Sequence, residues 1–361
     1  MNHRIGHIIR LIVFMTGIAL WAYSCAGVDL ETASNGDARY LCRFAFDKDE
    51  ELVPEEFVLA MARSLNTVHD TAHVKPEILD DTLYIAAGDY HSLAWGFSVP
   101  DDYTVYKEEE FLQDKSVSLL DLSARLREAD YSENEDPLIQ ALLPQDVTNL
   151  PVIPEASPLW HSYIRSELSY KADRVDFLEF IPQKIIQRLT FKVRIQVEGD
   201  LVVERAAACI RGVARGVELL SASIAPDDLG RTIFELSNNT ADIYTGTINT
   251  LGLLSPINTE DLFGRGVLTV VIQFQGVSQL TEIHINLFNE LKASALVSEI
   301  DVTGRYRLEC AEGIVDATAK VIHIRNQSDS PEESGAFDVW VEGDDEDNDH
   351  TIEVIPDEPD E

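Results

Sequence analysis

The chain has 361 residues, is 45% hydrophobic and carries a formal net charge of -36. So acidic a surface repels phosphate backbones and anionic lipid heads, which argues against nucleic acid as a partner and against a basic membrane-binding face. The length predicts about two domains, with enough apolar residues to bury a core in each.

The N-terminus has the layout of a secretory signal. Arg4 and Arg10 flank the start, an apolar run follows, and the small residue Ser24 precedes Cys25. The apolar run is shorter than the ~20 residues that span a bilayer. We therefore predict a signal peptide over residues 1–24 and acylation of the Cys25 thiol, with a plain signal peptide and a chance cysteine as the alternative.

Residues 25–38 hold few large apolar side chains and predict a flexible lipidated tether. An N-terminal β-sandwich is expected over residues 39–180. Its strand signals are the alternating apolar residues from Tyr40 to Phe46, the segment 57–63 (where helix stays open), and residues 82–97 with a turn around 86–90. Residues 116–130 predict a strand followed by a short helix.

The proline-punctuated segment 150–158 cannot be a helix interior, and a connection between domains is expected after it. We place the boundary near Ile181, because a strongly patterned series follows. From Leu189 to Val197 the residues alternate strictly between apolar and polar, which is typical of a half-buried strand. A second β-sandwich is thus expected over residues 181–342.

Further strands are expected in this second unit. Residues 268–274 and 281–287 predict a hairpin joined through Gly276, and Asn238-Asn239 is expected to separate two short strands. One short helix is expected within 289–300. The remaining strand signals lie at 202–210, 232–236, 243–248, 305–310, 318–324 and 337–341. Short strands with glycine and asparagine turns and no βαβ series predict an all-β protein.

The segment 343–361 is an acidic tail. Ile352 and Val354 alternate with Glu353 between two carboxylate runs, which fits a final edge strand. A solvated, disordered tail fits the composition equally well.

Cysteine, histidine and acidic residues give no catalytic or metal signature. If Cys25 is acylated, Cys42, Cys209 and Cys310 remain, either as buried thiols or with a bridge between the last two. His161, His284 and His323 each stand alone, which predicts surface or core roles. The run Asp345–Asp349 resembles the start of a calcium loop, but His350 stands where the loop needs glycine. No catalytic residue, cofactor or metal is predicted, and the protein is expected not to be an enzyme.

Three motifs together resemble the fimbrillin-associated anchor lipoproteins of Bacteroidales, the FimB/Mfa2-like group and related uncharacterised Bacteroides lipoproteins. They are the Ser24-Cys25 lipobox, the segment Leu83–Trp95 with its Gly88-Asp89-Tyr90, and the run from Leu189 to Val197 followed by the glycine-punctuated segment 206–217. The last two are similar to strands of that group.

This resemblance implies two tandem transthyretin-like β-sandwich domains on an N-terminal lipid tether. It implies attachment to the outer membrane through acyl chains on Cys25 and contact with fimbrial subunits by strand donation. The expected role is an anchor or an accessory or assembly subunit of fimbriae, exposed at the cell surface.

The alternative is a surface glycan- or nutrient-binding lipoprotein without a pilus. An exposed aromatic platform would favour that alternative, and Trp95, Trp160 and Trp340 are the candidates. A buried core position is the ordinary expectation for each of them.

Overall fold

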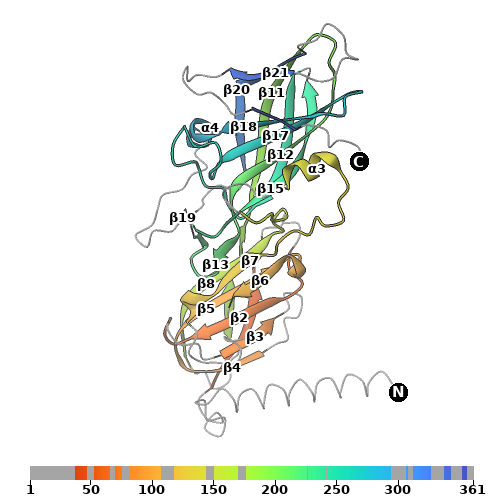
Figure 1. Cartoon of the computed structure of the whole chain (residues 1–361). Coiled ribbons are helices and arrows are strands. Elements are labelled where there is room, and N and C mark those ends of the chain that lie inside the picture. The colour runs from red at the N-terminus through yellow and green to blue at the C-terminus, as the bar shows by residue number, and fades with distance from the viewer. Residues whose placement is uncertain are drawn as a thin grey trace, which may run out of the picture.

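The chain forms an elongated molecule, with its first strands at one end and a large C-terminal sheet at the other (Figure 1). Within the part that the structure describes, helix is limited to four short elements, so the expected all-β class is confirmed. The structure, a computed structural model, describes residues 37–46, 53–65, 70–74, 82–106, 118–143, 150–169, 176–225, 227–240, 242–293, 306–307, 312–326, 337–342 and 352–355. The helical elements are α3 (Pro137–Leu142), α4 (Phe288–Ala293), η2 (Pro100–Asp102) and η3 (Leu119–Asp121).

Two sheets face each other in the N-terminal half, one of order β4-β1-β9 and one of order β10-β8-β5-β2-β3. The aromatic side chains between them explain the packing, because the Phe44 ring lies 4.6 Å from Phe57 and 5.4 Å from Phe180, centre to centre. The strands of this half are β1 (Asp37–Phe44), β2 (Phe57–Ala62), β3 (Asp70–Val74), β4 (Thr82–Ala86), β5 (Gly88–Phe97), β6 (Tyr103–Tyr106), β7 (Ser123–Leu126), β8 (Leu159–Leu168), β9 (Asp176–Phe180) and β10 (Gln183–Ile185).

A nine-stranded sheet makes up most of the C-terminal half, in the order β21-β20-β11-β16-β15-β12-β17-β18-β22. Two further short strands, β14 and β19, pair with each other. The strands are β11 (Gln187–Glu198), β12 (Val203–Ala214), β13 (Gly216–Glu218), β14 (Ser223–Ile224), β15 (Leu229–Thr240), β16 (Ile243–Thr250), β17 (Val267–Phe274), β18 (Leu280–Asn286), β19 (Tyr306–Arg307), β20 (Glu312–Asn326), β21 (Phe337–Glu342) and β22 (Ile352–Ile355).

The large sheet curls so that its two parts face each other across one core. Phe274 of β17 lies 5.2 Å from Phe337 of β21, ring centre to ring centre, although the two strands are far apart in the sheet order. The alternation predicted for β11 supplies this core, since Leu189, Phe191 and Val193 are fully buried. A curled sheet with one apolar interior is a sandwich-like arrangement.

Several local predictions are confirmed and others are wrong. Residues 57–62 form a strand, and β17 and β18 form the predicted hairpin, whose turn contains Gly276 with φ of 74°. Asn238 and Asn239 do not separate two strands, because both lie within β15.

The order expected over residues 116–130 is reversed. The turn η3 comes first, started by the Ser118 side chain accepting from the Leu120 N–H, and β7 follows it. Burial of Leu119, Leu122 and Leu126 accounts for the apolar spacing that suggested a helix.

The two halves share structure at their junction. β13, from the C-terminal half, pairs with β7 of the N-terminal half. One continuous core cluster includes Leu93 and Trp95 of β5 as well as Leu268 and Val270 of β17. The boundary near residue 181 is not tested by this arrangement and stays a prediction.

A segment from the N-terminal half lies between two strands of the large sheet. β15 pairs with β12 from Leu229 to Leu236, and with β16 only from Ser237 onward. Residues 151–156 occupy the gap: Ile153 N–H donates to the Arg231 carbonyl and Ala156 N–H donates to the Asn249 carbonyl, both at 2.9 Å. We call residues 151–156 the wedge.

Candidate functional site

The edge of the large sheet at β18 receives the last described strand of the chain. β22 pairs antiparallel with β18, with Ile352 opposite Ile283 and Ile355 opposite Leu280. β22 spans four residues and adds to a hairpin that is already paired through β17. Backbone groups at a sheet edge can pair with an extended segment, and along β18 they pair with β22.

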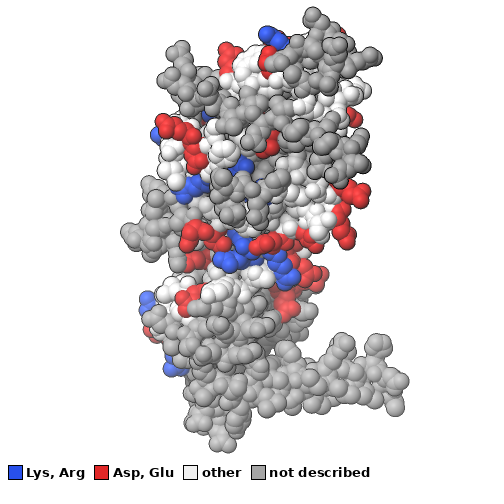
Figure 2. Space-filling view, in the orientation of Figure 1, with Lys and Arg blue, Asp and Glu red and all other residues white. Residues whose placement is uncertain are grey.

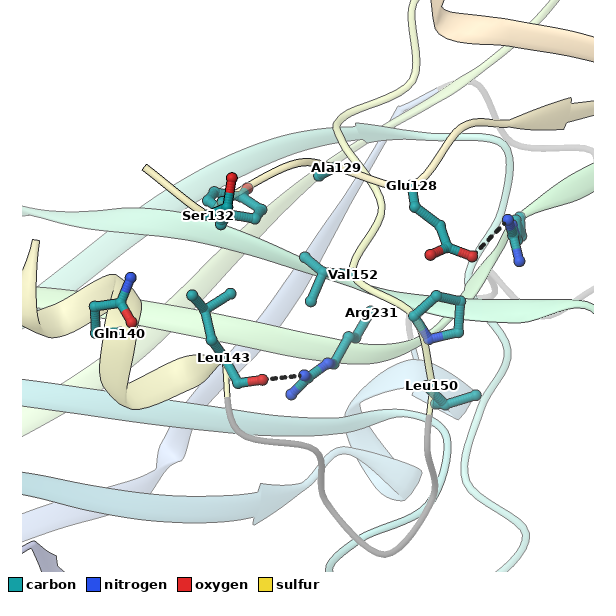
Figure 3. Close-up of a pocket in the computed structure, with 11 residues that line it drawn as sticks. Glu128, Ala129, Ser132, Gln140, Leu143, Leu150, Val152 and Arg231 are labelled. Carbon is teal, nitrogen blue, oxygen red and sulfur yellow. Dashed lines mark hydrogen bonds and ion pairs between the residues drawn. The ribbon is translucent and has the colours of Figure 1, made fainter. Parts of the chain in front are cut away.

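The structure also has an open cleft of about 640 Å³ at the junction of the two halves (Figure 3). Its walls are the chain from Glu128 to Leu143 and the start of the wedge, and its floor is β15. The residues that line it are Glu128, Ala129, Tyr131, Ser132, Gln140, Leu143, Leu150, Pro151, Val152, Arg215 and Arg231.

Arg231 forms the floor of this cleft and is only 3% exposed. Its guanidinium donates to the Leu142 carbonyl at 3.0 Å and to the Leu143 carbonyl at 2.6 Å, the second contact being drawn in Figure 3. The last carbonyls of a helix have no partner within the helix, so Arg231 satisfies the end of α3. The same residue pairs through its backbone with the wedge, and it therefore fixes both walls.

Two ion pairs join the two halves, one of them, Arg215 with Glu128, in the lining of the cleft. Arg215 donates to Glu128 at 2.9 Å, and Arg125 to Asp228 at 2.9 Å, so each pair joins a residue of the N-terminal half to one of the C-terminal half. A band in which basic and acidic residues alternate lies at this level of the molecule (Figure 2). Exposed ion pairs of this kind contribute about 0–1 kcal/mol each to the free energy of unfolding. They therefore serve more to align the two halves of the chain than to stabilise the fold.

The start of α3 is fixed by Asp136. Its carboxylate accepts from the Leu138 N–H at 3.0 Å as an N-cap and binds the Arg205 guanidinium at 2.6 Å. The hydrogen bond from Arg205 lowers the pKa of Asp136 below its ordinary value. Beneath the helix, Leu138 and Leu142 pack on Ala207, Cys209 and Val271 of the outer sheet face.

The residues singled out by sequence lie in separate places. Cys25 and the acidic run 345–349 are outside the described residues. His161 contacts the Leu219 carbonyl at 3.0 Å, His284 contacts the Thr269 hydroxyl at 2.9 Å, and His323 contacts Glu342 at 2.9 Å. In the described part of the chain, no three His, Cys, Asp or Glu side chains come together in a way that would hold a metal ion.

The cysteines and tryptophans are mostly in the core. Cys42 and Cys209 are buried in two different apolar clusters, and Cys310 lies outside the described residues. Trp95 and Trp160 are fully buried, which removes them as an exposed aromatic platform. Trp340 alone of the three candidates is part-exposed.

Within the described residues no helix is both long and apolar enough to cross a membrane.

The sequence did not reveal the cleft or the wedge. Arg231 lies within β15 and Arg215 lies in the glycine-punctuated segment 206–217, and only the structure brings the two into one cleft. One sequence feature could have indicated that the wedge is buried. It is the apolar pair Val152-Ile153 between Pro151 and Pro154, because such a pair is unusual in a solvated linker.

Comparison with known proteins adds a fold likeness. No family model and no curated protein matches the chain. A proposed adhesin from Bacteroides ovatus ATCC 8483 is similar in structure, with 11% identity, 72% of this chain and 86% of that chain covered, and a TM-score of 0.49. The fimbrial anchor protein Mfa2 from Porphyromonas gingivalis is similar at 12% identity, with 85% and 98% covered and a TM-score of 0.43.

Proposed polysaccharide-binding proteins from Bacteroides thetaiotaomicron VPI-5482 are similar at 13% identity, with 89% and 99% covered and a TM-score of 0.45. The solved structures similar to this all-β chain thus include the anchor group that its sequence motifs resemble. At identities of 11–13% these likenesses define no family for the chain.

Proposed function

We propose that this protein is a lipid-anchored protein of the outer membrane that acts as an anchor or accessory subunit of fimbriae in cell adhesion. The observation that carries the proposal is the β22–β18 pairing, because it shows an edge of the large sheet that takes an extended segment. An anchor needs such an edge at one end and a membrane attachment at the other.

The layout of the molecule supports this assignment. The first described strand, β1, begins at Asp37 in the N-terminal half, so the proposed tether before it would join the molecule there. Asp37 and Ala38, which were expected in the tether, belong to β1. The large sheet with β18, β20 and β21 lies at the opposite end (Figure 1). Acyl chains on Cys25 would then hold the N-terminal sandwich near the outer membrane and direct the large sheet away from it.

The partner under this proposal is a fimbrial subunit that binds by strand donation. An extended segment of the subunit would pair with β18 in place of β22, with main-chain hydrogen bonds giving affinity and alternate side chains giving specificity. Because β22 has only four residues, a longer segment would form more hydrogen bonds along the seven residues of β18. We propose that the protein is not an enzyme, since the sequence carries no recognised catalytic motif.

The strand-exchange step is tested by two truncations. Removing residues 343–361 deletes β22, while removing 357–361 keeps it and still removes acidic residues. Cells carrying each truncation are scored for fimbriae attached to the surface and for the subunit that copurifies with the protein. We expect deletion of residues 357–361 to leave the amounts of bound subunit and attached fimbriae as in wild type. We expect deletion of residues 343–361 to alter the amount of bound subunit. Equal amounts of bound subunit and attached fimbriae in all three strains would contradict the proposal.

The glycan- or nutrient-binding role remains a second candidate because of Trp340. It is the candidate platform residue that reaches solvent.

A further inference from the structure

The outer face of β20 and β21 carries a stacked pair of rings. His323 and Trp340 lie directly opposite each other on the two strands, with ring centres 4.9 Å apart and planes 6° from parallel. Their strand neighbours Ile322, Ile324 and Val339 are buried in the core. Side chains alternate between the two faces of a strand, so the ring pair is on the outside of the sheet.

Charged side chains surround the rings. The Glu342 carboxylate lies 2.9 Å from His323 Nε2, and the Arg325 guanidinium carbon lies 5.5 Å from the centre of the Trp340 ring. Arg325 is held in turn by Glu198 of β11 at 2.5 Å. The side chains of Arg325 and Glu342 are 54% and 73% exposed, so solvent and solutes reach their polar atoms.

The ring pair lies on the outer face of the sheet and not in its core. Among the described strands β21 is outermost at its end of the sheet, and His323 covers Trp340 from the β20 side. Both strands lie in the large sheet, at the end of the molecule opposite the N-terminal sandwich (Figure 1). A part-exposed indole with the Arg325 guanidinium over its ring and the Glu342 carboxylate on the neighbouring imidazole has the two elements that a pyranose needs, an apolar surface for its C–H face and partners for its hydroxyls.

We infer that Trp340, with His323, Arg325 and Glu342, forms a binding site for a neutral saccharide chain. The indole takes the C–H face of one pyranose ring, Glu342 accepts from a hydroxyl, and Arg325 donates to one. The occupant is neutral because the net charge of -36 repels polyanionic glycans at long range. The site goes beyond the anchoring role, since it gives the membrane-distal end its own ligand.

Tryptophan fluorescence tests this site in the full mature chain. After residue 25 the tryptophans are Trp95, Trp160 and Trp340, and the first two are fully buried. A saccharide on the ring pair therefore changes the emission of one part-exposed indole. The probes are maltohexaose, mannohexaose and chitohexaose up to about 5 mM, a range that covers weak binding, with a heparin hexasaccharide as the anionic comparison.

Matched variants separate the site from general effects. Trp340→Ala removes the platform, and binding is measured by calorimetry in parallel because the fluorophore is lost. Tyr163→Ala is the control, because Tyr163 is 39% exposed and also stacks on a histidine, His91, at 6.0 Å on the N-terminal sheet. Circular dichroism and thermal unfolding check that each variant is folded. Should Trp340→Ala unfold, Glu342→Gln and Trp340→Phe serve in its place.

We expect saturable binding of at least one neutral hexasaccharide, a loss of tenfold or more in Trp340→Ala, and no change in Tyr163→Ala. Three results would overturn the inference: no saturable binding of any neutral probe, unchanged affinity in Trp340→Ala, or binding of the heparin hexasaccharide alone. Trp340 would then be a cross-strand packing residue of the edge strand. None of these outcomes depends on fimbriae, so they do not test the anchoring proposal, which the truncations test separately.

Discussion

The side chain of Ile153 packs directly on the backbone of Gly230. A Cβ atom at position 230 would lie 3.0 Å from each of three Ile153 side-chain atoms, and Ile153 is fully buried. Position 230 thus needs glycine for the close approach of the wedge, although its φ is not in the left-handed region. The contact joins the segment between β7 and β8 to the core of the large sheet.

This contact predicts strong coupling between the two positions. Ile153→Ala should lower the free energy of unfolding by about 2–5 kcal/mol, the usual cost of emptying a buried isoleucine site. Gly230→Ala should cost about 1–3 kcal/mol through overpacking. In the double variant the alanine methyl at 230 has room, so the combined loss should be smaller than the sum of the two. Urea unfolding measures the free energy of unfolding of all three variants, and strict additivity would show that positions 153 and 230 are not coupled.

Replacing Arg231 should lower the free energy of unfolding more than replacing the exposed Arg205. Arg231→Met removes the hydrogen bonds to the buried Leu142 carbonyl and the part-buried Leu143 carbonyl at the end of α3, at a cost of about 1–3 kcal/mol for each group left without a partner. Arg205→Met, at the other end of the same helix, removes an exposed pair with Asp136 and should cost no more than about 1 kcal/mol. Thermal unfolding of the two variants compares them directly. A similar loss in both would mean that Arg231 does not support the helix.

Acylation of Cys25 is tested by Cys25→Ala. The thiol stands directly after the predicted signal, so the variant should appear in soluble fractions and should not incorporate labelled palmitate. Cys42→Ala is the control, because Cys42 is buried in an apolar cluster of the N-terminal half and its loss leaves the acceptor thiol in place. A Cys25→Ala protein that stays in the membrane and still carries label would contradict the prediction.

The division near Ile181 into two β-sandwiches is tested with a fragment of residues 181–361. The fragment should be β-rich and unfold cooperatively, because it contains β11 to β22. It lacks the wedge and α3, so its midpoint should rise when a synthetic peptide of residues 128–158 is added. A peptide with Ile153→Asp is the control and should give no rise. An aggregated or unfolded fragment, even with the wild-type peptide, would indicate one continuous domain.

Many of the strands were predictable from the sequence because apolar and polar residues alternate locally along them. β11 shows this best: its apolar residues recur at every second position and all point into one core. The β17–β18 hairpin was equally clear, since a glycine in the left-handed region fits the turn between two apolar runs. In such cases the local pattern and the tertiary environment agree.

Other features depend on contacts between distant parts of the chain. α3 has six residues, too few for a helical period to stand out, and it is fixed from outside by Arg205 and Arg231. The pattern Ile352-Glu353-Val354 fits a strand only if an edge such as β18 is available, and the sequence does not show that edge. Trp340 carries no local sign of exposure, because the face of β21 on which it lies is set by its pairing with β20.

The wedge also imposes an order on folding. Residues 151–156 are synthesised well before β15 and β16, the two strands that enclose them. Until those strands arrive, Ile153 lacks Gly230, the residue of β15 on which its side chain packs. The first half of the chain is therefore left incomplete during synthesis, and closure of the large sheet around the wedge requires a contact of long sequence separation. Such contacts form slowly, so we expect the last and slowest step of folding to occur at this junction and not within either half.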